Sequence, residues 1–282
     1  DPNPSAPTVS RIGDLRRAPG STTLDFSDML RFLTSPLPRG AGVVQCYIER
    51  DKSGLGKRMY PLYSLYMKQG DRFLLAGKKR AKQKTSNYLI SRSPSDLSRD
   101  SDSFLGKLRS NFVGTEFVAY DNGINPKDAK KRSNAGKHIR YELASVTYAS
   151  NVFGSRGPRK MRVHVPTVGP DGVRATFQPL NDKEGLLPHV ERGEMESIVQ
   201  LINKPPKWNE QVGAYVLNFN GRVTMASVKN FQLVTPTDHD TVVLQFGRVG
   251  KDLFTMDCQW PLSPLQAFSV CLSSFDYKLA CE

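Results

Sequence analysis

Short apolar segments rich in β-branched and aromatic residues dominate the chain from residue 41 onward. Most are bounded by Gly, Pro, Asn or Asp, which favour turns, and several alternate apolar with polar positions. Alternation with a period of two predicts strands that bury one face. The expected strands cover residues 43–50, 63–68, 73–77, 87–91, 161–166, 215–219, 223–228, 242–246 and 252–257. Many short strands at this spacing predict a β-barrel or a β-sandwich, and the strand pattern leaves both open.

The C-terminal segment 264–275 breaks this rhythm. Pro264 suits a first helical turn because its missing N–H would have no partner there. The apolar side chains that follow spread around nearly the whole helix circumference, with only Ser and one Gln between them. Such a helix needs burial on all sides, and it is far shorter than the roughly 20 residues that span a bilayer. The interior of a wide barrel could bury it, so the pattern predicts a central helix over about 264–275.

The N-terminal residues have a different composition. Residues 1–23 are rich in Pro, Ser and Gly, which predicts a flexible tail, and the folded domain is expected over 24–282. Residues 24–33 carry apolar side chains near one helical face, with Ser27 or Asp28 as the expected cap. A short helix is therefore predicted there.

Charge and cysteine content narrow the class of protein. The 282 residues include 40 Lys+Arg against 27 Asp+Glu, a net charge of +13. This excess favours an anionic partner, which could be nucleic acid, an anionic membrane or an acidic protein. The four cysteines are scattered without a CxxC pair, which predicts a reduced, intracellular protein with no disulfide framework and no zinc site. No signal peptide pattern or spanning apolar segment occurs, so any membrane contact is expected to be peripheral.

Catalytic patterns are missing from the sequence. The four histidines form no HExxH motif, and no GxSxG motif occurs. Residues 54–57 (GLGK) suggest a P-loop, but Asp51 occupies the first glycine position and Arg58 replaces the Ser or Thr. We therefore expect no enzyme activity, no metal and no cofactor.

Several long, uninterrupted motifs occur along the chain. They are residues 73–80 (FLLAGKKR), 84–91 (KTSNYLIS), 106–111 (GKLRSN), 120–123 (YDNG), 157–161 (GPRKM), 218–224 (NFNGRVT), 226–232 (ASVKNFQ), 245–249 (QFGRV) and 272–282 (LSSFDYKLACE). With these motifs, the chain resembles the C-terminal domain of the tubby family over roughly residues 43–282. The resemblance implies a mostly β fold, a closed 12-stranded barrel around the central apolar C-terminal helix, with short peripheral helices.

The resemblance also implies a ligand, phosphatidylinositol 4,5-bisphosphate. The lysine and arginine that grip the ring phosphates in the family fall on Lys107 and Arg109, and further contacts fall on Asn87 and Arg140. The residue types suit this role. Residues two apart in a strand share a face, Arg offers a planar fork for bidentate contact, and Lys offers a compact charge.

Further basic residues surround these positions. Each could contribute about 1 kcal/mol at most beside an anionic leaflet, and this attraction falls as salt rises. The expected accessory basic surface is Lys78, Lys79, Arg80, Lys82 and Lys84, and a second basic cluster comprises Lys127, Lys130, Lys131, Arg132 and Lys137. The run 78–82 also has the composition of a nuclear import signal.

The resulting expectation is a monomeric, cytoplasmic, peripheral membrane adaptor at the inner leaflet of the plasma membrane. The family resemblance adds protein cargo, receptor trafficking to cilia and release to the nucleus. The alternative is a nucleic-acid-binding transcription regulator that uses the same basic face. Basic clusters without interleaved stacking aromatics, and the lack of a recognition-helix motif, speak against it.

Overall fold

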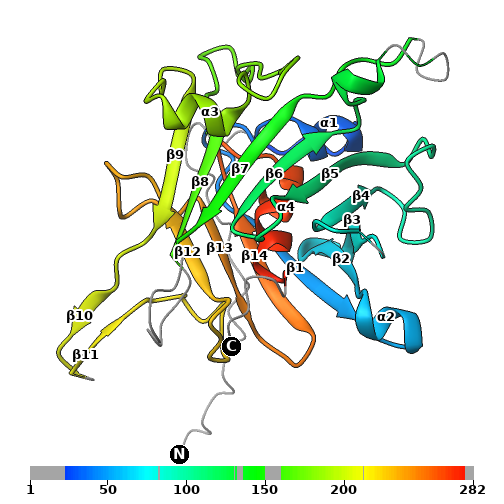
Figure 1. Ribbon diagram of the computed structural model, residues 1–282. Helices are drawn as coiled ribbons and strands as arrows, with labels where there is room; N and C mark the ends of the chain where they lie inside the picture. Colours follow the sequence, from blue (N-terminus) through cyan, green and yellow to red (C-terminus); the bar gives the residue numbers. More distant parts are fainter. Residues whose placement is uncertain are drawn as a thin grey trace, which may run out of the picture.

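The computed structural model describes residues 23–81, 83–129, 131, 136–149, 160–211 and 213–276. Its main feature is a closed barrel of 12 antiparallel strands, which confirms the barrel over the sandwich (Figure 1). The barrel strands pair in chain order, except that β9 pairs directly with β12, and β1 pairs with β14 to close the ring. The strands are β1 (Val44–Asp51), β2 (Leu62–Met67), β3 (Arg72–Lys79), β4 (Asn87–Ser91), β5 (Phe104–Ser110), β6 (Glu116–Asp121), β7 (Glu142–Tyr148), β8 (Met161–Pro166), β9 (Ile198–Asn203), β12 (Phe231–Val234), β13 (Leu244–Arg248) and β14 (Leu253–Cys258).

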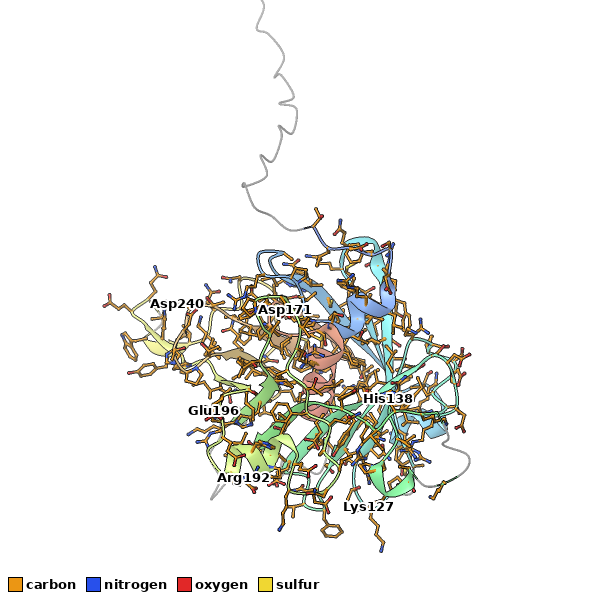
Figure 2. The ribbon with its side chains drawn as sticks, turned by 90° about the horizontal axis from the view of Figure 1, so that it is seen from above. Lys127, His138, Asp171, Arg192, Glu196 and Asp240 are labelled. Carbon is orange, nitrogen blue, oxygen red and sulfur yellow. The ribbon has the colours of Figure 1, made fainter. Side chains whose placement is uncertain are left out.

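Helix α4 (Pro264–Ser274) fills the barrel, as its apolar circumference predicts. The strands surround it in both views (Figures 1 and 2), and every one of its residues is buried. Ser263 and Gln266 form a capping box at its start. A Cβ on Gly77 of β3 would lie 2.8 Å from Leu272 Cδ1 and 3.1 Å from Phe268 Cε1. Glycine at this position therefore lets the helix approach the barrel wall.

The polar side chains of α4 all have partners. Ser269 Oγ donates to the Leu265 carbonyl at 2.7 Å, and Gln266 Nε2 donates to the Leu143 carbonyl of β7 at 2.6 Å. Gln266 Oε1 accepts a hydrogen bond from Arg174 Nη2 at 2.8 Å. Buried polar groups without partners would destabilise the core, so these bonds make a helix with Ser and Gln compatible with full burial.

Lys79 corrects one expectation about the basic surface. It ends β3 and faces the barrel interior, where its Nζ lies 3.0 Å from Asp276 Oδ2, two residues beyond α4. The Tyr88 hydroxyl donates to the same carboxylate oxygen at 2.9 Å. The Lys79 side chain is only 9% exposed. The prediction that Lys79 belongs to the accessory basic surface is therefore wrong, because strand alternation turns it away from Lys78.

The peripheral helices are short. Helix α1 (Met29–Thr34) begins later than the predicted 24–33, and Asp28 is its cap because its Oδ1 accepts from Arg31 N at 3.0 Å. Leu24 precedes the helix and packs against the core. The others are α2 (Leu55–Met59) and α3 (Leu186–Glu191), with single 3-10 turns at Gln69–Asp71 and Pro126–Asp128. The predicted tail, apart from Thr23, lies outside the described residues.

The segment after β9 differs from the sequence prediction. The expected barrel strands 215–219 and 223–228 are wrong. β10 (Lys207–Asn209) and β11 (Ala214–Val216) form a separate hairpin that projects from the barrel (Figure 1). Residues 217–230 form no strand and cross the outside of β13 and β14, where Arg222 binds Asp257 at 2.6 and 2.8 Å. A Cβ on Gly247 would lie 2.3 Å from Val223 Cγ2, so this segment is tightly packed.

The structure also bears on the expectations about cysteines, metal sites and membrane-spanning segments. Cys46, Cys258 and Cys271 are buried free thiols, whereas Cys281 lies outside the described residues. Within the described ranges, no group of three or more potential metal ligands comes together. Over the same part of the chain, none of the helices combines the length and the apolar character needed to cross a membrane.

Candidate anion-binding site

Strands β4, β5 and β6 bring the predicted site residues together on the outer face of the barrel. Asn87 of β4 lies opposite Arg109 of β5, and Lys107 lies opposite Tyr120 of β6. Leu108, between the two basic residues, is fully buried in the core. Strand alternation therefore places Lys107 and Arg109 together on the face opposite to Leu108, as their spacing predicts.

Lys107 is the most constrained of these cations. It is only 2% exposed, although it faces outward, and it lines a hollow of about 630 Å³ between the 92–103 and 122–141 loops. Burial, together with repulsion from Arg140, Arg99 and Arg109, lowers the pKa of Lys107 to about 7. The site therefore holds an ammonium group in surroundings that disfavour its charge unless an anion is present.

Arg140 presents unfilled hydrogen-bond donors. Its guanidinium carbon lies 4.0 Å above the Tyr120 ring centroid, a cation–π contact. Its Nε and Nη1 atoms are buried and have no hydrogen-bond partner. A Cβ on Gly123 would lie 2.4 Å from the Arg140 Cα, so glycine is needed for the loop to pass this close. Buried donors without acceptors cost about 1–3 kcal/mol each, so an acceptor at this position would relieve a penalty.

Asn87 adds an unfilled acceptor beside these donors. Its side chain is 4% exposed, and its Oδ1 is buried without a hydrogen-bond partner. The neighbouring Ser86 Oγ is also buried and unpartnered. The assigned orientation of an amide depends on its surroundings, so Asn87 can offer either its oxygen or its NH₂ to a ligand.

Arg99 is a site residue that the sequence did not predict. It lies in the loop before β5 and is exposed, and its pKa is lowered by partial burial and by repulsion from Arg80, Arg109 and Arg140. These mutual effects define a cation cluster of Arg80, Arg99, Lys107, Arg109 and Arg140. Arg99 stands alone in a Ser- and Asp-rich loop, where no periodicity signals its proximity to the strands. Tyr120 was also missed, although it belongs to the YDNG motif.

Two of the nearby carboxylates, Asp121 and Glu142, accept hydrogen bonds from groups outside the cation cluster. Asp121 Oδ1 accepts from the backbone N–H groups of Gly123 and Tyr141 at 3.0 and 2.9 Å, and its Oδ2 lies 2.7 Å from His138 Nε2. Glu142 Oε2 accepts from Leu186 N at 2.7 Å, and burial raises the pKa of Glu142. In the described part of the chain, no ion pair joins a member of the cation cluster to a carboxylate.

The predicted accessory basic residues differ in their exposure. Lys78 is half-buried on the outer face and Lys84 is exposed in the loop before β4, whereas Lys82 lies outside the described residues. In the second basic cluster, Lys127 pairs with Asp182 at 3.4 Å and Lys131 pairs with Asp128 at 2.5 Å. Lys137 is exposed, and Lys130 and Arg132 lie outside the described residues. The second cluster is thus partly neutralised.

These features define a class of protein: a closed antiparallel barrel filled by its own C-terminal helix, with a cation cluster on its outer face. The model of the Tub family matches residues 33–277, and the chain belongs to this family. Proteins of the family are not known as enzymes.

Three relatives illustrate the similarity. Tubby-related protein 3 of Mus musculus is 50% identical over 254 residues, which cover 89% of this chain and 55% of that protein. Tubby-related protein 2 of Homo sapiens is 51% identical over 252 residues, covering 88% and 48%. Protein king tubby 1 of Aedes aegypti is 47% identical over 255 residues, covering 89% and 60%. The chain spans about half the length of these curated relatives.

Proposed function

We propose that this chain is a peripheral membrane adaptor whose cation cluster binds the headgroup of phosphatidylinositol 4,5-bisphosphate. Lys107, Arg109 and Arg140 would contact the ring phosphates, and Asn87 would contact the ring. Arg99 and Arg80 would add charge at the rim. The family resemblance extends the proposal to a cytoplasmic, monomeric protein at the inner leaflet, with protein cargo, receptor trafficking to cilia and a nuclear pool.

The unfilled buried groups are the observation that carries this proposal. Arg140 has two buried donors without acceptors, and Asn87 has a buried acceptor without a donor. An inositol phosphate offers both kinds of partner, because its phosphates accept hydrogen bonds and its hydroxyl groups donate them. A phosphorylated polyol can therefore satisfy Arg140 and Asn87 in one site.

Nucleic acid fits the same surface less well. Single-stranded recognition relies on aromatic rings that stack on bases. The ring in the middle of the cluster, Tyr120, already carries the Arg140 guanidinium on one face and lies 5.7 Å from Lys107 Nζ. Stacking of a base on Tyr120 would displace these contacts. Binding to nucleic acid would then rest on phosphate contacts and fall steeply with salt.

Sedimentation with vesicles tests the proposal against this alternative. Vesicles with phosphatidylinositol 4,5-bisphosphate and vesicles with more phosphatidylserine can be matched in total charge. We expect the chain to sediment with the first and to stay largely in the supernatant with the second at physiological salt, because general charge attraction is screened there. Equal sedimentation with both, together with tight and sequence-selective binding to duplex DNA at that salt, would overturn the proposal.

Proton uptake on binding gives an independent prediction from Lys107. In the free site the pKa of Lys107 is about 7, so at about pH 8 the side chain is mostly neutral. A bound polyanion favours the ammonium form and raises this pKa toward the ordinary lysine value of about 10.4. Binding of inositol 1,4,5-trisphosphate at about pH 8 should therefore take up close to one proton. The contribution of Lys107 to affinity should be greatest below pH 7 and fall as pH rises from about 7 toward the pKa of the bound state.

Calorimetry in two buffers of different ionisation enthalpy measures this uptake. Lys107→Arg is the matched control because arginine stays charged throughout this range, so its proton uptake should vanish while binding persists. The work is best done above pH 7, since phosphate groups themselves titrate near pH 6. Identical heats in both buffers for the unaltered chain would contradict the role of Lys107.

A further inference from the structure

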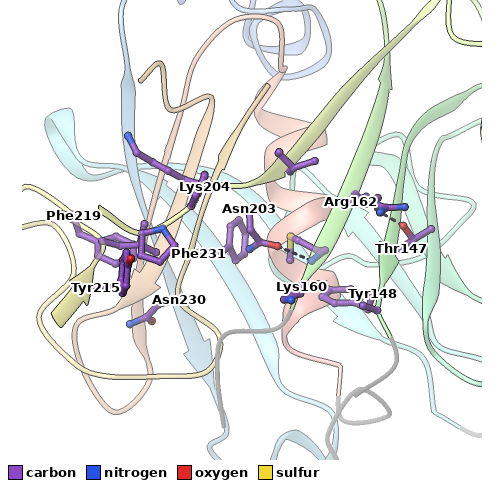
Figure 3. A pocket seen from close by; sticks show the side chains of 16 residues that line it. Thr147, Tyr148, Lys160, Arg162, Asn203, Lys204, Tyr215, Phe219, Asn230 and Phe231 are labelled. Carbon is purple, nitrogen blue, oxygen red and sulfur yellow. Dashed lines mark hydrogen bonds between the residues drawn. The ribbon is translucent and has the colours of Figure 1, made fainter. Parts of the chain in front are cut away.

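A second cavity lies on another part of the barrel, beside the β10–β11 hairpin (Figure 3). Its volume is about 810 Å³, within the range of roughly 300–1,000 Å³ that small-molecule sites occupy. We call it the hairpin pocket. It is lined by residues of β7, β8, β9 and β12 and of the segment after β11, among them Lys160, Arg162, Ile202, Lys204, Leu217 and Phe231.

The walls of the hairpin pocket are mainly apolar, and both of its amide side chains make hydrogen bonds within the protein. Asn203 Oδ1 accepts from Met161 N at 2.6 Å. Asn230 donates from Nδ2 to the Met225 carbonyl at 2.9 Å and accepts from Arg248 N at 2.9 Å. Pro205 and Pro206 have no N–H to offer. A peptide in this pocket would leave many of its own amide groups without partners, so the walls favour a ligand with an apolar body.

The charged residues of the hairpin pocket are all cationic. Lys160, Arg162 and Lys204 line it, and no described residue that lines it is acidic. Among the described residues, none of these three cations has an ion pair with a carboxylate. Figure 3 shows Lys204 on the side of Tyr215 and Phe219, and Lys160 on the other side, beside Tyr148. These cations therefore favour a ligand that is apolar along its body and has an anionic end.

We propose that the hairpin pocket binds a long-chain fatty acid, with its alkyl chain against Phe231, Ile202 and Leu217 and its carboxylate near Lys160 or Lys204. A fatty acid has one anionic end and no polar group along its body, which matches both properties of the pocket. Each CH₂ of the alkyl chain removed from water would strengthen binding about fourfold.

This binding is independent of the cation cluster. The cluster lies on β4, β5 and β6 with their flanking loops, whereas the hairpin pocket adjoins β8, β9 and β12. The labelled residues of Figure 2 show the separation, because Lys127 and His138 of the 122–141 loop lie across the molecule from Asp240, which pairs with Lys207 of the hairpin. The two ligands should therefore not compete for one site.

Displacement of a fluorescent fatty acid tests the proposal. A dansyl-labelled undecanoic acid should bind the full chain saturably, one per chain, and oleate below its micelle concentration should displace it. Leu217→Glu places a carboxylate in the apolar wall and should weaken binding at least about tenfold. Val228→Glu is the matched control, since Val228 is 47% exposed and does not line the pocket. If Leu217→Glu lowers the melting temperature, Tyr215→Ser replaces it, because Tyr215 is 69% exposed.

Two further pairs of variants test whether the ligand needs an anionic end and whether it binds away from the cation cluster. Lys160→Gln with Lys204→Gln should weaken oleate binding roughly tenfold and leave oleyl alcohol unchanged, because only oleate has a charged end. Lys107→Ala with Arg109→Ala should leave fatty-acid binding unchanged, and inositol 1,4,5-trisphosphate should not displace the probe. The proposal is overturned by a lack of saturable oleate binding, by equal losses in Leu217→Glu and Val228→Glu, or by displacement with the inositol phosphate.

Discussion

Phe268→Asp is expected to abolish soluble folding of this chain. Phe268 lies in the middle of α4 and is 0% exposed, and its ring approaches Gly77 on the barrel wall. Loss of a buried Phe side chain alone typically costs about 3–5 kcal/mol. A carboxylate in this position would also have no cation or hydrogen-bond donor designed for it, which adds several kcal/mol. Because whole domains are stable by only about 5–15 kcal/mol, the sum removes most of the stability.

The soluble fraction after expression and the melting temperature of any soluble protein measure this effect. Phe112→Asp is the matched control, since it makes the same chemical change at a side chain that is 73% exposed. The control should express and melt close to the unaltered chain. A soluble Phe268→Asp variant with a similar melting temperature would show that α4 does not hold the barrel together.

The central helix could be predicted because few other structures would bury all the apolar side chains of its sequence. The side chains of 264–275 are apolar around the whole circumference, and a helix of this kind must be enclosed. The segment 223–228 shows the limit of the same reasoning. Its apolar positions resemble a strand, but an apolar residue such as Val223 can also bury itself against the outside of a sheet. The Arg222–Asp257 pair helps to hold this segment against the outside of the sheet. The two residues are 35 positions apart, so the sequence around 223–228 does not show that the pair forms.

Lys79 shows an error that the local pattern could have prevented. The basic run Lys78, Lys79 and Arg80 suggests one charged surface, although the strand that begins before this run continues to Lys79. Alternation along that strand turns Lys79 inward between two outward neighbours. What alternation could not supply is the partner that makes a buried lysine acceptable. Asp276 is 197 residues away in sequence and is brought there only when α4 enters the barrel.

The candidate site was predictable where it depends on one strand and unpredictable where loops meet. The spacing of Lys107 and Arg109 fixes their common face, and the family resemblance points to Asn87 and Arg140. The convergence of Arg99 on the same place depends on how the 92–103 loop folds over the barrel, for which the sequence has no periodic signal. The depressed pKa of Lys107 has the same origin, because it arises from burial under loops and from cations on separate segments.

The accumulation of like charges implies a conflict between stability and binding. The pKa of Lys107 is about 7 in the folded chain, below its value of about 10.4 in an unfolded chain. A group of this kind destabilises the fold when protonated, most fully below pH 7, and the penalty disappears as pH rises toward the unfolded value. Protein sites that bind ligands often carry such costs, so removing the charge should stabilise the free protein while it abolishes binding.

Lys107→Met with Arg109→Met is therefore expected to abolish sedimentation with phosphatidylinositol 4,5-bisphosphate vesicles without loss of stability. Each charged hydrogen bond to phosphate contributes about 1.5–3 kcal/mol, so removing two cations should weaken binding roughly 10²- to 10⁴-fold. Methionine keeps most of the side-chain length, which avoids a cavity at the buried position. At about pH 6 the melting temperature should equal or exceed that of the unaltered chain, by roughly 2–4 °C for each kcal/mol of relieved repulsion. This difference should shrink as pH approaches 10.

Lys183→Met with Lys251→Met separates the geometry of the site from net charge. These two exposed lysines lie outside the cation cluster, so the control loses the same two charges from other parts of the surface. It should sediment with the lipid vesicles nearly as well as the unaltered chain, because general attraction to the leaflet is screened at physiological salt. If both double variants lose binding equally, the interaction depends on the excess of positive charge and the cluster has no specific role. If the Lys107 and Arg109 variant instead melts several degrees lower at about pH 6, the two cations are structural, and the conflict between stability and binding does not exist at this site.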